Sequence, residues 1–459
     1  MYLDENNALV ACYVRCFTRS HTANRKAIVT TTTAAEGRTS EAPYAAGRIL
    51  RGTADHVAKL DEAWRVIRDR HTRGLPLHNV SGLERGLPMP EGISPWVLDD
   101  EWAGALYAEP VRKLGLEHLG GAGGVHDVMV TNRLTAAIYA AMQVTVRPGS
   151  TVIGVSASYS HPCVRRAVRD AGAQLVEVVG LAQFRAALDR EPDVSVVALT
   201  RLAVTYEALD EPDIREIIRL AHARGALVVL DDAGGARVGP ALLGQPRSLQ
   251  LGVDLAATGL DKYGVFGPRV GLLGGRTDLV AAVRARSFEL GSECRPVLFP
   301  AVVESLRRYS DQRVRDLVAS TKNAGEVLRS RLGDIVENTP FIFTLSGEAI
   351  GRELNRRSGG ASIQLAPIEA TATLAATLLK EHGLLTVHFA GLPPGTSALL
   401  IKFIAEETME SVGGAERFAD MIDQSLTRAA QTSTDLAAVR ALLLGQGAAA
   451  APDDAALTA

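Results

Sequence analysis

The 459-residue sequence has four cysteines, no long apolar run and almost no excess of charge of either sign. Cys12, Cys16, Cys163 and Cys294 are too few for a disulfide-stapled fold and lack the spacing of a zinc site. No apolar run approaches the roughly 18 residues that a membrane span requires. We therefore expect a cytoplasmic protein that binds no metal and does not enter a membrane.

The sequence also lacks the basic excess that is typical of nucleic-acid-binding proteins. Lysine and arginine (49 residues) nearly balance aspartate and glutamate (52 residues), for a formal net charge of −3. Proteins that bind nucleic acid or an anionic membrane surface usually carry a basic patch or stripe. We therefore expect a small-molecule substrate and no nucleic-acid partner. With 47% hydrophobic residues, the chain is long enough for a large domain and a smaller one.

The two ends of the chain have the weakest hydrophobic patterning. Residues 1–75 predict a partly flexible N-terminal extension, in which apolar residues at three- and four-residue spacing indicate a helix near 53–73. Residues 431–459 end in an alanine-rich stretch of low complexity and predict a flexible tail.

Between the ends, short apolar runs alternate with helical patterns. The runs lie at 127–131, 151–156, 174–179, 194–200 and 226–232. Strands that are apolar on both faces and separated by helices predict an α/β fold with a mostly parallel sheet sandwiched by helices. This predicts a large domain over residues 76–300.

The pattern changes near residue 300. A long helix is predicted over 299–332, followed by strand-like segments at 361–368, 384–390 and 398–405. The mixture predicts a smaller α+β domain over residues 301–430.

Polar residues follow two of the predicted strands. Asp231 and Asp232 end one apolar run, and Thr131, Asn132 and Arg133 lead from another into a helix. In parallel α/β sheets, ligands bind beyond the carboxyl ends of the strands. The free N–H groups of a helix N-terminus suit a phosphate there.

A lysine follows these residues in a glycine-rich turn. Lys262 lies between Gly259 and Gly264, just before another predicted strand. A phosphate-binding site, a buried acid and a lysine are the three features that hold pyridoxal 5'-phosphate (PLP). The lysine amine forms a Schiff base with the cofactor aldehyde, while the acid keeps the pyridine nitrogen protonated.

These residues resemble fold type I PLP-dependent enzymes, the aspartate aminotransferase superfamily, over roughly residues 76–425. The pattern of Asp261 and Lys262, then Gly267 and Pro268, then Gly271 is similar to that of bacterial L-seryl-tRNA(Sec) selenium transferases, the selenocysteine synthases. The resemblance implies a large PLP-binding domain and a smaller C-terminal domain.

The resemblance also implies roles for individual residues. Asp231 would face the pyridine nitrogen, with Asp232 as the alternative. Ala233 would lie beneath the ring and His161 would stack on it. The phosphate would be held by Thr131, Asn132, Arg133 and Thr258.

Several of these residues have simpler interpretations. Lys262 could be a surface lysine in a loop, and Asp231 could cap a helix or pair with Arg237. The segment at 131–133 could be an ordinary helix start, and His161 could only cap a helix. Tyr206 lies where relatives contact the ring oxygen or the substrate.

One departure concerns the substrate carboxylate. Aminotransferases usually bind it with an arginine of the small domain, whose guanidinium contacts both carboxylate oxygens. The comparable stretch here contains Lys402, whose amine is a single point charge. Arg295 is a possible substitute. The candidate substrate residues are therefore Asp232, Tyr206, Arg295 and Lys402.

The resemblance implies amino-acid chemistry in which a bond at the substrate Cα breaks and a quinonoid forms. Our sharpest hypothesis is an O2-using monooxygenase-decarboxylase of nucleoside-antibiotic biosynthesis, which converts a β-hydroxy-α-amino acid of the glycyl-nucleoside type to a carboxamide. A PLP ammonia-lyase, an aldolase or an aminotransferase is the alternative. A tRNA-directed selenium transferase and a non-catalytic PLP-binding protein represent other classes. A homodimer or higher assembly is expected in each case.

Overall fold

The computed structural model describes residues 47–359, 364–389 and 394–446. The chain divides into two compact units, residues 1–41 and 42–459, and every described residue lies in the second. The predicted extension over residues 1–46 and the last part of the predicted tail lie outside the described residues. Within the second unit, the domain boundaries that we expect near residues 75 and 300 stay predictions.

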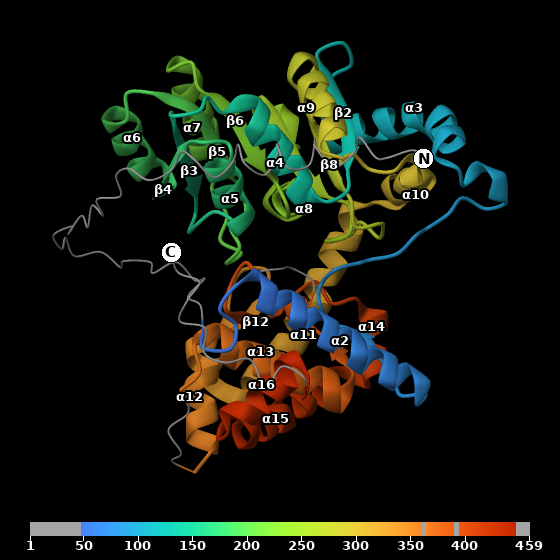
Figure 1. Cartoon of the computed structure of the whole chain (residues 1–459), viewed down its shortest axis with the longest axis vertical. Helices are drawn as coiled ribbons and strands as arrows, with labels where there is room; N and C mark the ends of the chain where they lie inside the picture. Colours follow the sequence, from blue (N-terminus) through green and yellow to red (C-terminus); the bar gives the residue numbers. More distant parts are fainter. Residues whose placement is uncertain (1–46, 360–363, 390–393, 447–459) are drawn as a thin grey trace, which may run out of the picture. The chain divides into compact units, whose positions relative to one another are not determined.

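A seven-stranded sheet forms the larger group of elements (Figure 1). Its order is β2-β8-β7-β6-β5-β3-β4, and β3, β4, β5, β6 and β7 pair in parallel. Only β8 runs antiparallel to its neighbours β2 and β7. The strands are β2 (His126–Thr131), β3 (Thr151–Ser156), β4 (Gln174–Val179), β5 (Val194–Thr200), β6 (Leu227–Asp231), β7 (Leu255–Gly259) and β8 (Gly271–Arg276). The predicted mostly parallel sheet is confirmed.

Helices cover both faces of this sheet because its strands are apolar on both faces. In β6, Val228 and Leu230 point into one hydrophobic cluster and Val229 into the other. One face packs on α3 (Asp100–Leu119), α6 (Gly180–Arg190), α7 (Glu211–Ala223) and α10 (Phe299–Arg308). The other packs on α4 (Leu134–Thr145), α5 (Pro162–Asp170) and α9 (Thr277–Glu289). The strand ends between these layers are therefore free to form a site.

A smaller antiparallel sheet with the order β12-β10-β9 forms the second group of elements. Its strands are β9 (Glu337–Asn338), β10 (Phe343–Ser346) and β12 (Ala398–Ile401). Apolar side chains from α12 (Gly347–Arg357), α13 (Pro367–Thr377) and α15 (Gly414–Ser433) form a core with it. β1 (His78–Asn79) pairs in parallel with β11 (Leu384–Leu385), and α14 (Glu406–Val412) precedes α15.

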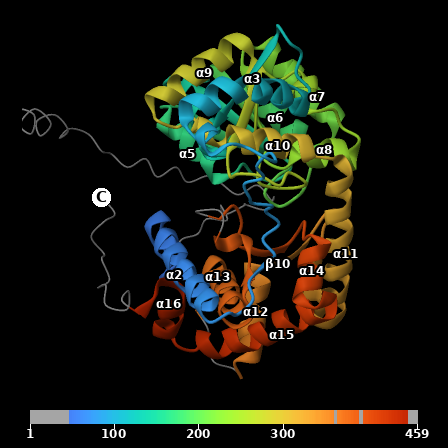
Figure 2. The same cartoon turned by 90° about the vertical axis from the view of Figure 1, so that its right-hand side faces the viewer.

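The long helix predicted over 299–332 is two helices, so that prediction is corrected. α10 ends at Arg308, and α11 (Asp311–Leu332) begins after an extended Tyr309. The Ser310 hydroxyl accepts a hydrogen bond of 3.2 Å from the Arg313 amide, which caps α11. Figure 2 shows α11 as one continuous rod, and it contacts both α8 (Gly235–Leu243) and α15.

Two of the predicted strand-like segments also differ from the structure. In the described part of 361–368, α13 begins at Pro367. In 384–390, β11 is followed by the short 3-10 turn η6 (Val387–Phe389). The third segment, 398–405, does contain β12.

The helix predicted near 53–73 is α2 (Thr53–Thr72), but the predicted flexible tail from residue 431 is wrong for its described part. α15 continues to Ser433, and α16 (Leu436–Leu444) follows. Val439 and Leu443 of α16 are buried in a cluster with Ala63 of α2 and residues of α13. Burial of these side chains stabilises α16. Composition alone suggests a flexible tail for this segment.

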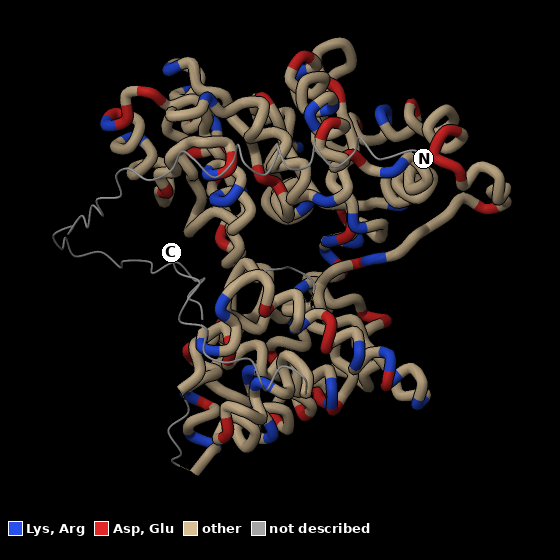
Figure 3. The backbone as a smooth tube through the Cα atoms, in the orientation of Figure 1, with Lys and Arg blue, Asp and Glu red and all other residues tan. Residues whose placement is uncertain are grey.

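No helix in the described ranges is both long and apolar enough to cross a membrane. Figure 3 shows basic and acidic residues interspersed along both groups of elements, in line with the nearly balanced composition.

Candidate active site

A cavity of about 220 Å³ lies beyond the carboxyl ends of the parallel strands. Residues that follow β2, β3, β5, β6 and β7 line it, together with segments near Leu83 and between Val387 and Lys402. It brings together Arg133, His161, Tyr206, Asp231, Ala233, Lys262 and Lys402 of the sequence-predicted residues.

Lys262 lies in the turn between β7 and β8, with its side chain 18% exposed. Its amine is 4.0 Å from the Asp261 carboxylate. Burial lowers the pKa of Lys262, which favours the free amine that a nucleophile needs. A Cβ at residue 259 would lie 2.9 Å from Lys262 Cε, so the glycine there makes room for this side chain.

Asp231 ends β6 with its carboxyl group facing the cavity. The Ala233 amide donates a hydrogen bond of 3.3 Å to Asp231 Oδ1, the only one that the described residues give this carboxyl group. Burial raises the pKa of Asp231 to about 6, and the nearby charge of Lys262 opposes the rise. A buried carboxylate with so few partners can accept a cationic ligand atom.

Asp232 points away from the cavity, so its predicted substrate contact is corrected. Arg201 forms a fully buried ion pair with it, and the Ser248 hydroxyl donates to the same carboxylate at 2.6 Å. The alternation of side chains along β6 explains why only one of two adjacent acids faces the cavity. Of the two aspartates, only Asp231 faces the cavity, so its contact with the pyridine nitrogen stays the prediction.

His161 both caps a helix and lines the cavity. Its Nδ1 accepts a hydrogen bond of 3.2 Å from the Cys163 amide at the start of α5. Burial, together with the charges of Lys262 and Arg166, lowers the pKa of His161 to about 4. The ring is therefore neutral near pH 7, which suits stacking on a flat ligand.

Four arginines line the same cavity: Arg85, Arg133, Arg166 and Arg269. Burial and then the charges of Arg85 and Arg133 lower the pKa of Arg269 to about 10, so three of the four cations lie within electrostatic range of one another. Next to them begins α4, with Arg133 at the N-cap position and no side-chain cap in the described chain. Guanidinium groups at an open helix N-terminus form an anion site.

Sequence reasoning found Arg133 but missed the other three arginines. Arg269 lies inside the motif that carries the family resemblance and could have been found there. Arg85 comes from a segment far away in the chain, and its only sequence signal is its charge.

Thr131, Asn132 and Thr258 do not line the cavity, so their predicted direct contact with the phosphate is corrected. Thr131 Oγ1 donates to the Arg133 carbonyl at 2.9 Å, and the side-chain Nδ2 of Asn132 donates to the Gly291 carbonyl at 3.1 Å. Thr258 is fully buried, and its hydroxyl accepts a hydrogen bond of 2.8 Å from Arg237. The hydrogen bonds of these three side chains hold the loops that border the cavity, and the side chains themselves do not face it.

Arg237 is a positioning residue that the sequence did not reveal in this role. It is fully buried and donates to the carbonyls of Ala233 and Gly259 at 3.0 and 2.9 Å. It therefore ties the loop after β6, which follows Asp231, to the end of β7, which leads to Lys262.

Lys402 enters the cavity from the end of β12. Its amine donates hydrogen bonds to the hydroxyl groups of Tyr206 at 2.6 Å and Tyr263 at 3.3 Å. The two hydroxyl groups are 2.5 Å apart. Burial and then the charge of Lys262 lower the pKa of Lys402 to about 7. A second amine therefore lines the site, and no carboxylate of the described residues lies at hydrogen-bond distance from it.

Arg295 is not at this site, which corrects its predicted role as a carboxylate clamp. It is exposed and pairs with Asp100 at 2.6 Å, at the start of α3. Arg295 and Asp100 therefore form an ion pair at the surface.

No family model matches the chain, but curated relatives do. A UPF0425 pyridoxal phosphate-dependent protein of Methanothermobacter thermautotrophicus is 30% identical over 364 residues, which cover 78% of this chain and 90% of the relative. The chain belongs to this family. A UPF0425 protein of Methanosphaera stadtmanae is 27% identical over 363 residues, again covering 78% of this chain and 90% of the relative.

The UPF0425 chain also shares its fold with solved structures. The PLP-dependent cyclase OrfR superposes with a TM-score of 0.52 at 15% identity, over 78% of this chain and 97% of its own. A SepCysS structure in complex with the SepCysE N-terminal domain superposes with a TM-score of 0.51 at 12% identity, over 77% of this chain and 95% of its own. Family and fold confirm the predicted fold type I resemblance and the predicted cofactor, PLP.

The residues present fit PLP. Lys262 supplies the amine, and Asp231 is a buried carboxylate with room for a cationic partner. The arginines at the α4 N-terminus provide the anion site. Each of these roles follows from placement in the cavity and stays a prediction for the residue concerned.

Proposed function

We propose that this UPF0425 protein is a PLP-dependent enzyme that breaks a bond at the Cα of a small amino acid. One observation carries the proposal: Lys262, Asp231 and an arginine-lined helix N-terminus face one cavity at the strand ends. Bound PLP supplies an electron sink for the electron pair that the broken bond leaves at Cα.

The chain's own residues have separable tasks in this proposal. Lys262 would hold the cofactor through its amine and would accept or deliver the proton at the substrate Cα. Asp231 keeps the pyridine nitrogen protonated. Arg133 and Arg269 bind the phosphate at the start of α4.

Lys402 is the proposed partner of the substrate carboxylate. It is buried, it lies in the same cavity as Lys262, and Tyr206 and Tyr263 hold its amine in place. Because a lysine is a point charge, this arrangement would hold one oxygen and leave the carboxylate free to rotate.

The specific reaction that we propose is oxidative decarboxylation of a β-hydroxy-α-amino acid of the glycyl-nucleoside type. One amino acid and one O2 give one carboxamide, one CO2 and one water: the Cα–carboxylate bond breaks, a C=O bond forms at Cα, and O2 takes up the four electrons. Some proteins with selenium-transferase-like sequences are similar to carboxamide-forming PLP monooxygenase-decarboxylases, and that resemblance is the support for this reaction. The apolar Leu83, Leu202 and Val204 beside the cavity offer an environment that suits O2.

The test is dissolved O2 together with released CO2 in a glycyl-nucleoside assay of the holoenzyme. We expect stoichiometric O2 loss, CO2 release and carboxamide formation, all abolished in Lys262→Ala. The exposed Lys322→Ala serves as the matched control and keeps full activity. Substrate turnover without loss of dissolved O2 would contradict oxidative decarboxylation. The coarser proposal, an enzyme that breaks a bond at Cα, would still stand.

The other candidate reactions give different products in the same assay. Amino transfer needs a keto acid and yields a new amino acid, whereas an ammonia-lyase or aldolase releases ammonia or an aldehyde without O2. An RNA-directed selenium transferase would bind seryl-tRNA at physiological salt, which the balanced charge argues against. Substrate-induced spectral change without any turnover would identify a non-catalytic PLP-binding protein.

A further inference from the structure

Three non-glycine residues of the described chain have a left-handed backbone, and all three belong to one aromatic cluster. Tyr206, Tyr263 and Phe403 have φ angles of 68°, 53° and 46°. The centre of the Tyr263 ring lies 4.3 Å from that of Phe403 and 6.3 Å from that of Tyr206. Such a backbone is strained at a residue with a side chain, and strain of this kind is concentrated at functional sites. The cluster therefore directs attention to its two phenol groups.

The Lys402 amine lies beside the two phenol groups and completes a triangle of hydrogen-bonding atoms. Lys402 Nζ is 2.6 Å from Tyr206 Oη and 3.3 Å from Tyr263 Oη, and the two oxygens are 2.5 Å apart. All three side chains line the candidate active-site cavity. Burial raises the pKa of Tyr263 to about 12 and that of Tyr206 well above its usual value. Both hydroxyl groups therefore keep their protons near pH 7.

A count of hydrogens shows which donors of the triangle remain for a ligand. An ammonium group has three N–H donors, and each phenol has one O–H donor. Two N–H donors serve the tyrosine oxygens, and one O–H donor serves the contact between those oxygens. One N–H of Lys402 and one tyrosine O–H are left, and no acceptor among the described residues takes either of them.

The distances indicate that the remaining O–H group belongs to Tyr263. Tyr206 accepts the shorter hydrogen bond from the amine. A hydroxyl that accepts a short hydrogen bond from a cation becomes a better donor, because hydrogen bonds in a chain polarise one another. Tyr206 therefore donates to Tyr263, and the Tyr263 hydrogen is left for a ligand.

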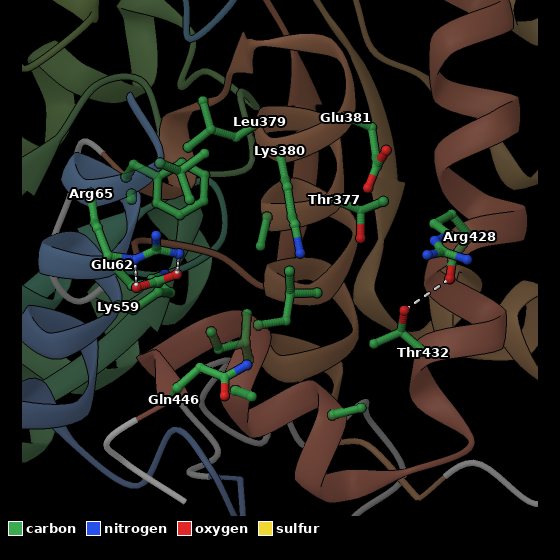
Figure 4. A pocket seen from close by; sticks show the side chains of 18 residues that line it. Lys59, Glu62, Arg65, Thr377, Leu379, Lys380, Glu381, Arg428, Thr432 and Gln446 are labelled. Carbon is green, nitrogen blue, oxygen red and sulfur yellow. Dashed lines mark hydrogen bonds and ion pairs between the residues drawn. The ribbon is translucent and has the colours of Figure 1, made fainter. Parts of the chain in front are cut away.

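A second cavity, of about 290 Å³, lies among α2, α13, α15, α16 and the π-helical turn η5 (Leu378–His382) (Figure 4). Figure 4 shows that Arg65 donates to Glu62 and that Thr432 donates to the Arg428 carbonyl, at 3.1 Å. The Lys59 amine of this wall is fully buried. The described residues that line this cavity include no counterpart of the triangle of one amine and two phenol groups.

We propose that the Lys402 amine and the Tyr263 hydroxyl bind the two oxygens of a free α-carboxylate, one donor to each oxygen. The inference rests on the proposed function, because it names the class of amino acid that the cavity accepts. With the second donor, the carboxylate is no longer free to rotate about its bond to Cα. An ester or amide carries no negative charge and has one good acceptor oxygen. The substrate is therefore a free amino acid and not an aminoacyl ester of the kind that links serine to a tRNA.

L-Serine and its methyl ester test this selectivity in the PLP-loaded protein. The absorbance of the bound cofactor reports the binding of each, without O2 and at about pH 6.5, where Lys402 is mostly protonated. Tyr263→Phe is expected to raise the Kd of serine about tenfold, because a hydrogen bond to a charged acceptor is lost. The Kd of the ester should rise by no more than about twofold, because Lys402 still serves its carbonyl. The ratio of the two Kd values, ester to free serine, should therefore fall about fivefold. A comparison of this ratio between variants cancels the different basicity of the two amines.

Tyr107→Phe is the matched control, since Tyr107 lies on α3 and does not line the cavity. It should leave both Kd values unchanged. A ratio that does not change in Tyr263→Phe, while serine still alters the spectrum, would overturn this inference and leave the proposed function intact. A fall of the ratio in Tyr206→Phe but not in Tyr263→Phe would refute the assignment to Tyr263. If the wild-type spectrum responds to none of L-serine, glycine and L-threonine, the proposed function fails and the inference fails with it.

Discussion

At the scale of single residues, two adjacent acids illustrate how the structure divides tasks. Asp231 faces a cavity and has one hydrogen bond from the described residues, whereas Asp232 is buried against Arg201 and Ser248. The first carboxylate is placed for a ligand and the second holds the fold together. Substitution of each should therefore affect different measurements.

Asp231→Asn is expected to lower kcat at least about 100-fold while the free energy of unfolding changes little, because the amide cannot keep the pyridine nitrogen protonated. Asp232→Asn is expected to lower the free energy of unfolding by about 3–5 kcal/mol, because Arg201 is left buried and unpaired. Urea titration and steady-state kinetics on both variants check this. The reverse pattern would mean that Asp232 contacts the cofactor.

Lys402 leads to a prediction about pH. The amine binds a carboxylate only when it is protonated, and its pKa in the free protein is about 7. The KM for an amino-acid substrate should therefore be constant below pH 7 and rise up to tenfold per pH unit above it. KM over the range of about pH 6 to 8.5 is the measurement.

Two variants separate this effect from other titrations near the site. In Lys402→Met, KM is expected to be high and to lose the rise above pH 7. Lys402→Arg keeps its charge throughout the range, so its KM should be insensitive to pH there. A wild-type pH profile retained in Lys402→Met would assign the titration to another group.

The candidate site could be predicted in part because strand order fixes which residues share an edge. Asp231 and Lys262 end neighbouring parallel segments, so their meeting follows from the alternation of strands and helices. The direction of a side chain does not follow from that alternation, which is why Thr131 and Thr258 were placed wrongly. Arg85 arrives from a distant segment through tertiary packing, and the sequence contains no periodic signal for it.

At the scale of elements, α16 shows where composition misleads. Its segment is rich in alanine and leucine and lies near the end of the chain, which resembles a low-complexity tail. The structure buries one side of it against α2 and α13, and the Asp435 carboxylate accepts a hydrogen bond of 2.8 Å from the Ala437 amide. Packing that depends on residues nearly 400 positions earlier in the chain cannot be read from the local pattern.

Leu443→Ala tests the role of α16. Leu443 is 1% exposed, so removal of its side chain should lower the free energy of unfolding by about 2–5 kcal/mol in urea titration. Leu436, in the same helix, is 38% exposed, and Leu436→Ala is expected to change stability by no more than about 0.5 kcal/mol. If Leu443→Ala is equally neutral, α16 does not contribute to the fold as the structure indicates.

At the scale of the whole molecule, an exposed apolar patch bears on assembly. It lies at the 3-10 turn η1 (Pro95–Val97) and the first half of α3. Trp96 and Trp102 are 56% and 55% exposed, and their rings meet edge to face with centroids 5.1 Å apart. Leu98 and Leu106 nearby are 46% and 49% exposed. Contiguous exposed aromatic and aliphatic side chains are typical of a surface that another protein covers.

We propose that a second copy of the chain covers this patch, in line with the homodimer implied by the fold type I resemblance. Light scattering after size exclusion should give a particle of twice 48.7 kDa or more. The double variant Trp96→Ser and Trp102→Ser should shift the particle towards 48.7 kDa. Trp64→Ser, which changes a 58% exposed tryptophan on α2, is the matched control and should leave the assembly intact. A wild-type protein that runs as a single chain at micromolar concentration would contradict this proposal.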